Sequence, residues 1–152
     1  LNGIDIEKSI ESLTTFKGVK RRLELIYNNN EKIIFSDFAH HPTAINFVTK
    51  SLKERYKSKK VLGILELGSN TMSSGYHSIE NLVEASSEIE HLLILDSKES
   101  LAKNNTTSFF NNHQSLIEKA NSIMNDYDII LIMTNKDFTK ISKPLIEYLE
   151  QK

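Results

Sequence analysis

KIIFSDFAHHP, residues 32–42, is the stretch that decides the fold of this chain. The apolar run at its start predicts a strand, and the proline at its end can open the first turn of an amphipathic helix over residues 42–56. One acid and two imidazoles, Asp37, His40 and His41, therefore lie between a strand tip and a helix start. In α/β proteins, these are the places where phosphates and nucleotides bind.

On both sides of this stretch, apolar runs alternate with stripes of helical spacing. Upstream, residues 23–27 and 32–35 flank Asn28-Asn29-Asn30-Glu31. Asparagine tolerates the left-handed conformations of tight turns, so we expect a hairpin. Apolar runs predict further strands at residues 61–67, 91–95 and 128–133. Apolar stripes predict helices around residues 6–13, 45–52, 79–83, 116–124 and 141–149.

Strands that are apolar on both faces and alternate with helices predict the α/β class. We expect a Rossmann-like three-layer domain with a mainly parallel sheet of about six strands, one antiparallel edge strand from the hairpin, and helices on both faces. Residues 97–112 are polar and poor in signals, so we expect a loop there with room for one helical turn.

Length and composition narrow the class of protein. The chain has 152 residues, which suits one domain. Its 19 basic and 20 acidic residues give a net charge of -1, which argues against a nucleic-acid or anionic-membrane partner. It has no cysteine, no apolar run of about 20 residues and no signal peptide. We expect a cytoplasmic protein and, because the chain begins with Leu1, a fragment of a longer one.

Polar residues follow each predicted strand, and the carboxyl ends of parallel strands meet at one edge of the sheet. The four groups are Asp37, His40 and His41; Glu66, Ser69, Asn70 and Thr71; Asp96 and Ser97; and Thr134 and Asn135. The first two groups are too dense for simple capping, so we expect them to be functional. For Asp96 and Thr134 we expect helix capping.

Several chemical roles remain open for these residues. The Asp37 carboxylate could accept hydrogen bonds from ribose hydroxyls, the His40 imidazole could donate to a phosphate, and both could bind a metal. Lys20-Arg21-Arg22 is either a solvated patch or an oxyanion site. The sequence has neither G-x-x-x-x-G-K-[ST] nor G-x-G-x-x-G. If the protein uses ATP, the main binding site for the triphosphate therefore lies on another domain.

Three strings together resemble the C-terminal domain of the Mur ligase family. They are FKGVKRRLE (residues 16–24), DFAHHPTAI (37–45) and ELGSNTM (66–72), in the order in which the family has them. The resemblance covers nearly the whole chain. The SNTM string resembles the branch that ligates UDP-N-acetylmuramate to the murein tripeptide L-alanyl-γ-D-glutamyl-meso-diaminopimelate, rather than the muramate–alanine ligases.

This resemblance implies an ATP- and Mg²⁺-dependent amide ligase of three domains, in which an amine attacks an acyl phosphate. The chain would be the third domain alone, with no catalytic residue of its own, and inactive without the upstream domains that hold most of the ATP and Mg²⁺. It implies contacts with ATP for Asp37, His40 and Arg22 (less well matched by Arg21). It implies contacts with the incoming peptide for Ser69, Asn70, Thr71 and Met72.

The chain departs from the family pattern in two places. Gly68 stands where the family usually has an arginine suited to a substrate carboxylate. Residues 133–138, MTNKDF, stand where the family has a glycine-rich turn, and lost glycines would alter how closely the backbone can approach a ligand.

Two other functions remain open on the sequence. A metal hydrolase could use Asp37, His40, His41 and His77, although adjacent histidines seldom point at one metal. A non-catalytic nucleotide- or partner-binding module, such as a degenerate ligase paralogue, would fit the glycine at position 68.

Overall fold

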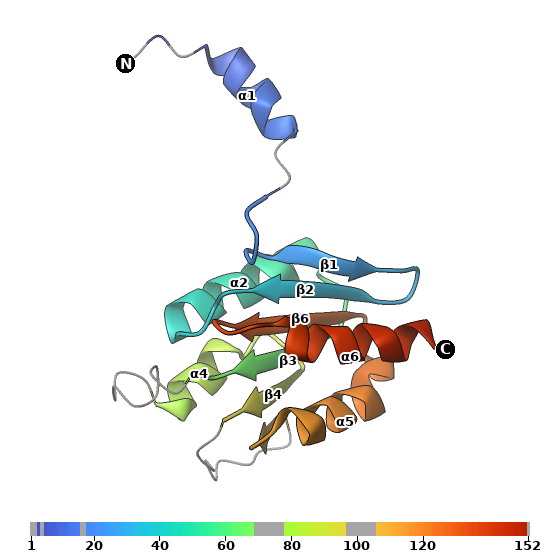
Figure 1. The fold of residues 1–152 in the computed structure, drawn as a ribbon. Helices are drawn as coiled ribbons and strands as arrows, with labels where there is room; N and C mark the ends of the chain where they lie inside the picture. Colours follow the sequence, from blue (N-terminus) through green and yellow to red (C-terminus); the bar gives the residue numbers. More distant parts are fainter. Residues whose placement is uncertain (1–2, 4, 16–17, 69–77, 97–105, 152) are drawn as a thin grey trace.

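One six-stranded sheet forms the centre of the molecule, in the computed structural model of residues 3, 5–15, 18–68, 78–96 and 106–151 (Figure 1). The strand order is β1-β2-β6-β3-β4-β5. Only β1 runs antiparallel to its neighbour. The strands are β1 (Glu24–Asn28), β2 (Ile33–Asp37), β3 (Val61–Glu66), β4 (His91–Leu95), β5 (Thr107–Phe110) and β6 (Ile129–Thr134). The predicted sheet, with one antiparallel edge, is confirmed.

Helices cover both faces of this sheet, also as predicted (Figure 1). On one face lie α2 (Pro42–Arg55) and α4 (Ile79–Ala85). On the other lie α5 (His113–Ile123), the 3-10 turn η1 (Met124–Asp126) and α6 (Thr139–Glu150). Strand side chains alternate between the two layers: in β6, Leu131 and Met133 pack under α2, whereas Ile130 and Ile132 pack under α5 and α6.

The order of the strands explains where a ligand can enter. From β2 the chain advances to β3, β4 and β5, and then returns to place β6 between β2 and β3. Right-handed crossovers put helices on opposite faces for advance and return. The helices α2 and α4, which follow β2 and β3, therefore lie on one face, and α5, which leads back to β6, lies on the other, where α6 also packs after β6. Such a divergence opens a crevice at the carboxyl ends of these strands.

The prediction of a loop over residues 97–112 is wrong at its end. Residues Thr107–Phe110 form β5, which pairs in parallel with β4 as the outer strand of the sheet. The strand has only four residues, so it lacks the long apolar run that marked the central strands. The β-forming sequence Thr-Ser-Phe-Phe was the local signal for it.

The hairpin between β1 and β2 forms where it was predicted, but by a different turn mechanism. Asn29 Oδ1 accepts hydrogen bonds from the backbone N–H of Glu31 (2.9 Å) and Lys32 (2.6 Å). Among the described residues other than glycine, only Arg21 and Leu23 have positive φ. The asparagine side chain therefore makes the turn through its oxygen and not through a left-handed backbone.

The first helix, α1 (Ile6–Thr14), is capped by Asp5, whose Oδ1 accepts from the backbone N–H of Glu7 at 3.0 Å. Its apolar side chains are all exposed: Ile6 by 74%, Ile10 by 58% and Leu13 by 67%. Figure 1 shows α1 apart from the sheet. None of the helices in the described residues has the length and apolar character needed to cross a membrane.

Candidate functional site: a pocket between β2 and α2

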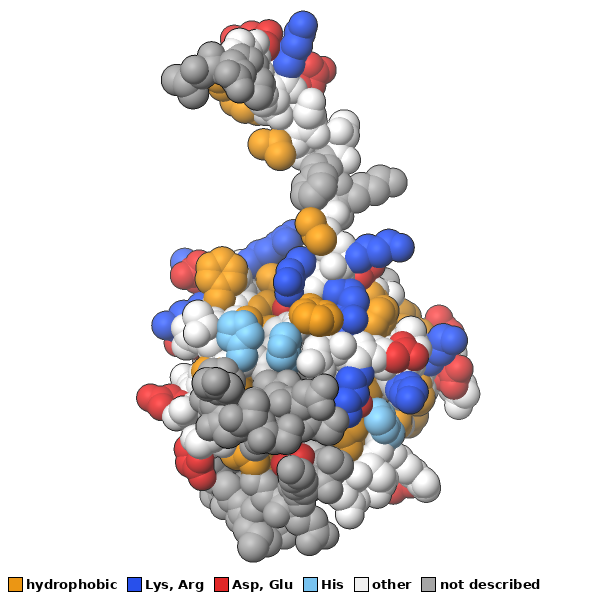
Figure 2. All heavy atoms as spheres, turned by 60° about the vertical axis from the view of Figure 1, so that its left-hand side comes forward, with side chains coloured by type: hydrophobic (Ala, Val, Ile, Leu, Met, Phe, Trp, Pro, Cys, Tyr) orange, Lys and Arg blue, Asp and Glu red, His pale blue; other side chains and the backbone are white. Residues whose placement is uncertain are grey.

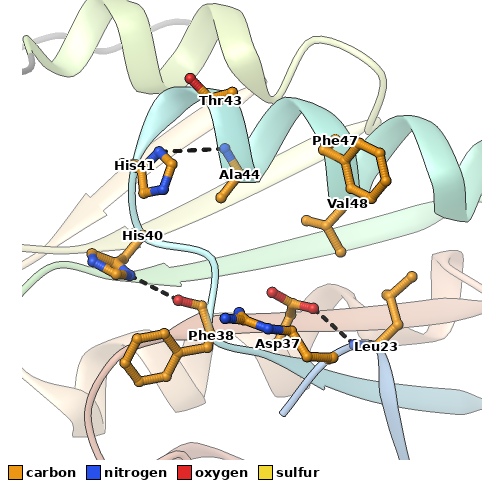
Figure 3. A pocket seen from close by; sticks show the side chains of 10 residues that line it. Leu23, Asp37, Phe38, His40, His41, Thr43, Ala44, Phe47 and Val48 are labelled. Carbon is orange, nitrogen blue, oxygen red and sulfur yellow. Dashed lines mark hydrogen bonds between the residues drawn. The ribbon is translucent and has the colours of Figure 1, made fainter. Parts of the chain in front are cut away.

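A pocket of about 610 Å³ opens where β2 ends and α2 begins (Figure 3). This is a common size for a small-molecule site. The three residues predicted to contact ATP all line it. The lining consists of Arg22, Leu23, Asp37, Phe38, His40, His41, Thr43, Ala44, Phe47 and Val48.

Asp37 holds the floor of the pocket together. The residue is 5% exposed. Its Oδ2 accepts from the backbone N–H of Leu23 and its Oδ1 from that of Ala39, both at 2.7 Å. These contacts tie the segment before β1 to the turn before α2. Asp37 is therefore first a structural clamp, and each oxygen keeps a lone pair for one further donor.

Two adjacent arginines at the rim of the pocket have different roles. Arg21 has φ 58° and donates from its guanidinium to the carbonyls of Thr134 and Lys136, the second at 2.7 Å. Arg21 is thus fixed to the end of β6. Arg22 is exposed and lines the pocket, and its Cζ lies 5.6 Å from the centre of the Phe38 ring. Within the described residues its guanidinium has no hydrogen bond, so it can bind an anion.

The two histidines at the start of α2 also differ. His41 is the N-cap of the helix, with its Nδ1 3.4 Å from the backbone N–H of Ala44. His40 Nδ1 lies 2.8 Å from the carbonyl oxygen of Phe38. Since a carbonyl can only accept, Nδ1 carries the proton, and Nε2 has no hydrogen bond within the described residues. His40 therefore offers Nε2 to a ligand, whereas His41 caps the helix.

The opposite wall of the pocket is apolar. Leu23, Ala44 and Val48 line it, together with Phe47, whose side chain is 75% exposed. In Figure 2, histidine, basic and hydrophobic side chains gather on this face of the molecule. The positive end of the α2 dipole adds to the charge of Arg22 on the polar side. The pocket can therefore hold a ligand with one anionic part and one planar apolar part.

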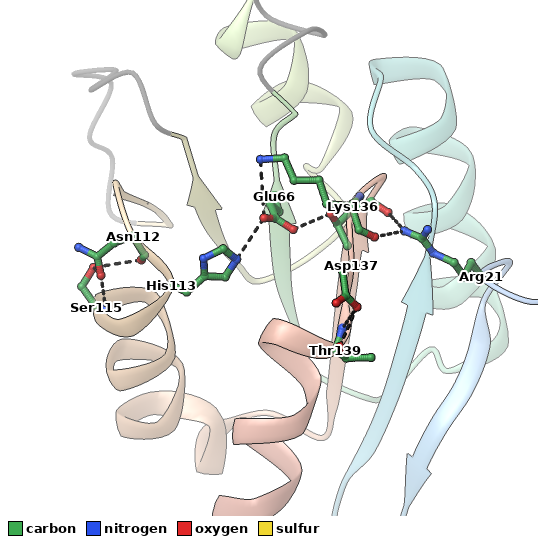
Figure 4. A network of polar contacts seen from close by, with 9 residues as sticks. Arg21, Glu66, Asn112, His113, Ser115, Lys136, Asp137 and Thr139 are labelled. Carbon is green, nitrogen blue, oxygen red and sulfur yellow. Dashed lines mark hydrogen bonds and ion pairs between the residues drawn. The ribbon is translucent and has the colours of Figure 1, made fainter.

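A second polar group lies beside the pocket, on the α5 and α6 side of the sheet (Figure 4). Glu66, 2% exposed, accepts a 2.7 Å hydrogen bond from the Thr134 hydroxyl and contacts the His113 ring at 3.1 Å. The prediction that Thr134 caps a helix is wrong: α6 begins after Phe138, and Thr134 Oγ1 donates to Glu66. The position of Glu66 after a predicted strand indicates a functional role for it, but the sequence carries no such signal for His113 and Lys136, because apolar periodicity does not mark them.

Some predicted residues lie outside the described part of the chain. They are the proposed peptide-binding residues Ser69, Asn70, Thr71 and Met72, and His77 of the metal-hydrolase alternative. In the described part, no group of three histidine, aspartate or glutamate side chains could hold a metal ion.

The structure shows what surrounds the two positions at which the sequence departs from the family pattern. A Cβ at Gly68 would lie 2.9 Å from Asn135 Oδ1, so Asn135 fills the space that a side chain at position 68 would need. In the 133–138 turn, Lys136 and Asp137 are not among the residues with positive φ, so the turn needs no glycine. The Thr139 hydroxyl donates to Asp137 Oδ1 at 2.7 Å, and this contact lowers the pKa of Asp137.

Residues 21–135 match the family described as Mur ligase, glutamate ligase domain. Among curated proteins, the UDP-N-acetylmuramate–L-alanine ligase of Aquifex aeolicus is 27% identical over 161 residues, which cover 98% of this chain and 34% of that protein. That of a Hydrogenobaculum strain is 30% identical over 95 residues, which cover 61% of this chain and 21% of that protein. The chain thus spans about a third or less of the relatives it matches.

Solved structures agree. A murein peptide ligase from Psychrobacter arcticus superposes with a TM-score of 0.74 at 27% identity, over 99% of this chain and 34% of that one. A domain from a Haemophilus ducreyi protein superposes with a TM-score of 0.69 at 25% identity, over 84% of this chain and 99% of that one. With the family match covering well over half of its length, the chain belongs to the Mur ligase family and carries the fold of its C-terminal, glutamate ligase domain.

Proposed function

We propose that this chain is the C-terminal domain of an ATP-dependent amide ligase that joins UDP-N-acetylmuramate to the tripeptide L-alanyl-γ-D-glutamyl-meso-diaminopimelate. The enzyme would be cytoplasmic, with a UDP-sugar domain and a central ATPase domain upstream in the same protein. The sequence match over about a third of each relative's length supports this division. The Haemophilus domain, covered over 99% of its length, supports a separate folding unit.

The observation that carries the proposal is the convergence of Arg22, Asp37 and His40 on one pocket at the start of α2. The Arg22 guanidinium suits phosphate oxygens, and the Leu23, Ala44 and Phe47 wall suits a planar base. Because His40 Nδ1 carries the proton, its Nε2 is an acceptor and suits a hydroxyl or amino group of the nucleotide. Asp37, which is almost fully buried, would accept one further donor such as a ribose hydroxyl. The pocket is open and bounded by this domain on one side, so it fits half of a nucleotide site.

Most of the nucleotide and its Mg²⁺ would be held by the central domain. Within the described residues no group of three histidine, aspartate or glutamate side chains could hold a metal ion, and the Asp37 and Glu66 carboxylates already accept hydrogen bonds from the protein. ATP supplies the phosphoryl group that turns the muramate carboxylate into an acyl phosphate. Closure of this domain would keep water from that intermediate until the amine attacks.

The choice of tripeptide over L-alanine rests on two supports. One is the SNTM string at residues 69–72. The other is the similarity to the murein peptide ligase of Psychrobacter arcticus at 27% identity. The L-alanine ligase of Aquifex aeolicus has the same identity, and so L-alanine is the competing amine substrate.

The test uses the full-length protein that carries this chain, with UDP-N-acetylmuramate, ATP and Mg²⁺, and either the tripeptide or L-alanine. Mass spectrometry of the UDP-linked product and release of phosphate are measured together. We expect ATP-dependent ligation of the tripeptide with a higher kcat/KM than of L-alanine. A preference for L-alanine would move the protein to the other branch. The absence of ligation with either amine would favour the non-catalytic alternative.

A further inference from the structure

The Glu66 cluster lies outside the nucleotide pocket and has its own geometry (Figure 4). Glu66 Oε2 accepts from Thr134 at 2.7 Å, and Oε1 lies 3.1 Å from His113 Nε2. The Lys136 ammonium lies 3.8 Å from the same Oε1. The three partners come from β6, from the first residue of α5 and from the turn before α6, so they meet only in the folded chain.

Among the three partners of the Glu66 carboxylate, Lys136 makes the longest contact and is the one able to bind a ligand as well. Glu66 is 2% exposed, and its two oxygens already have the Thr134 hydroxyl and the His113 ring. At 3.8 Å, the Lys136 contact is longer than a hydrogen bond, and this ammonium makes no hydrogen bond within the described residues. The Lys136 side chain is 48% exposed. It can therefore pair with an incoming anion while it stays beside the Glu66 carboxylate.

Three other described positions at this edge of the sheet do not supply that cation. Arg21 is fixed by its bonds to the carbonyls of Thr134 and Lys136. Arg22 faces the pocket under α2. A side chain at Gly68 would meet the Asn135 amide at 2.9 Å. Among these described positions, Lys136 thus remains as the cation on the α5 and α6 side of the turn.

The same turn borders the nucleotide pocket. The backbone carbonyl of Lys136 accepts from Arg21 at 2.7 Å, and the Arg21 guanidinium lies 4.7 Å from the centre of the Phe38 ring, which lines the pocket. A molecule held by the Lys136 side chain would therefore lie next to the nucleotide and on the other side of residues 134–136. That is the place for a second substrate in a ligase.

We propose that Lys136 binds the free C-terminal carboxylate of the incoming amine substrate, and that Glu66 is a positioning residue that holds Lys136 over the end of β3. This inference rests on the proposed function, since an amino acid or peptide that donates its amine also carries a carboxylate. Glu66 keeps the ammonium at the site through charge, and the loose 3.8 Å contact leaves its N–H donors for the ligand.

The test compares wild type, Lys136→Gln and Lys136→Arg in the full-length protein, with the tripeptide and with its C-terminal carboxamide. If the wild type prefers L-alanine, L-alanine and L-alaninamide replace them. We expect Lys136→Gln to raise KM for the acid by roughly tenfold, the usual size for one lost charge-assisted contact. The KM for the carboxamide, the KM for ATP and kcat should stay within about twofold. Lys136→Arg should restore most of the affinity.

Two further variants separate positioning from stability. Lys140→Gln removes an exposed lysine from the first turn of α6 and should leave every constant unchanged. Glu66→Gln should raise KM for the acid but not for the carboxamide, a difference that general loosening of the fold would not produce. Ligation with an unchanged KM for the acid in Lys136→Gln would overturn this inference alone. A rise in the KM for ATP instead would assign Lys136 to phosphate. No ligation by the wild type would overturn the proposed function together with it.

Discussion

Replacement of Asp37 by alanine should cost this domain about 3 kcal/mol of unfolding free energy. The carboxylate accepts two backbone N–H groups at 2.7 Å, from Leu23 and Ala39, and the residue is 5% exposed. Hydrogen bonds to a charged group contribute ~1.5–3 kcal/mol each, and entry of water into the open pocket recovers part of the loss. Leu23 also has φ 44°, a strained conformation that this contact helps to hold.

The measurement is urea unfolding of this 152-residue chain, followed by far-ultraviolet circular dichroism. We expect a lower midpoint with an unchanged slope for Asp37→Ala. Asp37→Asn should lose about 2 kcal/mol, because its NH₂ group would face one of the two backbone donors. Thr43→Ala is the matched control. It lines the same pocket but is exposed, so it should stay within ~0.5 kcal/mol of wild type.

An Asp37→Ala variant as stable as Thr43→Ala would refute this reasoning, because it would show that the two contacts add nothing to the fold. The result also governs how activity is interpreted. A ligation assay on Asp37→Ala needs a temperature at which the variant is shown to be folded. Only then does a loss of rate report on the proposed nucleotide site.

Other expectations follow from single contacts. Arg21→Met should lower the unfolding free energy by ~2 kcal/mol, because two backbone carbonyls lose their donor. Arg22→Met should leave the stability in urea unchanged and raise the KM for ATP several-fold. Equal effects of the two substitutions in both assays would contradict the different roles of the two arginines. Gly63→Ala should lower the stability of the fold by about 1–3 kcal/mol, because its Cβ would overlap Ile89 Cδ1. In thermal unfolding, the double variant with Ile89→Val should regain most of the lost stability. Additive losses of stability in the double variant would contradict this contact. Burial lowers the pKa of His91 below its ordinary 6.5, so the unfolded chain binds the proton more readily, and the unfolding free energy should fall as pH drops below about 6.5. In His91→Gln, urea midpoints at pH 7.5 and 5.5 should differ less than in wild type, and an equal difference would exclude His91 as a source.

Most of the fold was predictable because the central strands are apolar on both faces. In a domain of this size, such apolar runs are best buried as central strands of a covered sheet, and the helices between them keep a regular apolar stripe. The strand β5 escaped because it is a short edge strand that begins in a polar segment. The asparagine turn was placed correctly but explained wrongly, since the side chain of Asn29 and not its backbone makes the bend.

The candidate site was predictable to a lesser degree. Residues just after a strand converge by topology, which is why Asp37, His40 and Glu66 were found. The contact of Glu66 with His113 was not predicted, because His113 lies 47 residues further along the chain. A contact across that separation depends on how α5 packs on the sheet. No local pattern near His113 reports it.

The sequence by itself determined the alternation of strands and helices, the start of α2 at Pro42, the absence of a phosphate loop from this chain and the strings it shares with the Mur ligases. These depend on local order and composition, which a linear chain carries in full. Only the tertiary structure decided which of two adjacent arginines is fixed and which faces the pocket, and that Asp37 clamps the backbone. Those roles depend on neighbours brought from distant segments, because hydrogen-bond geometry and burial exist only once the sheet and its helices have packed.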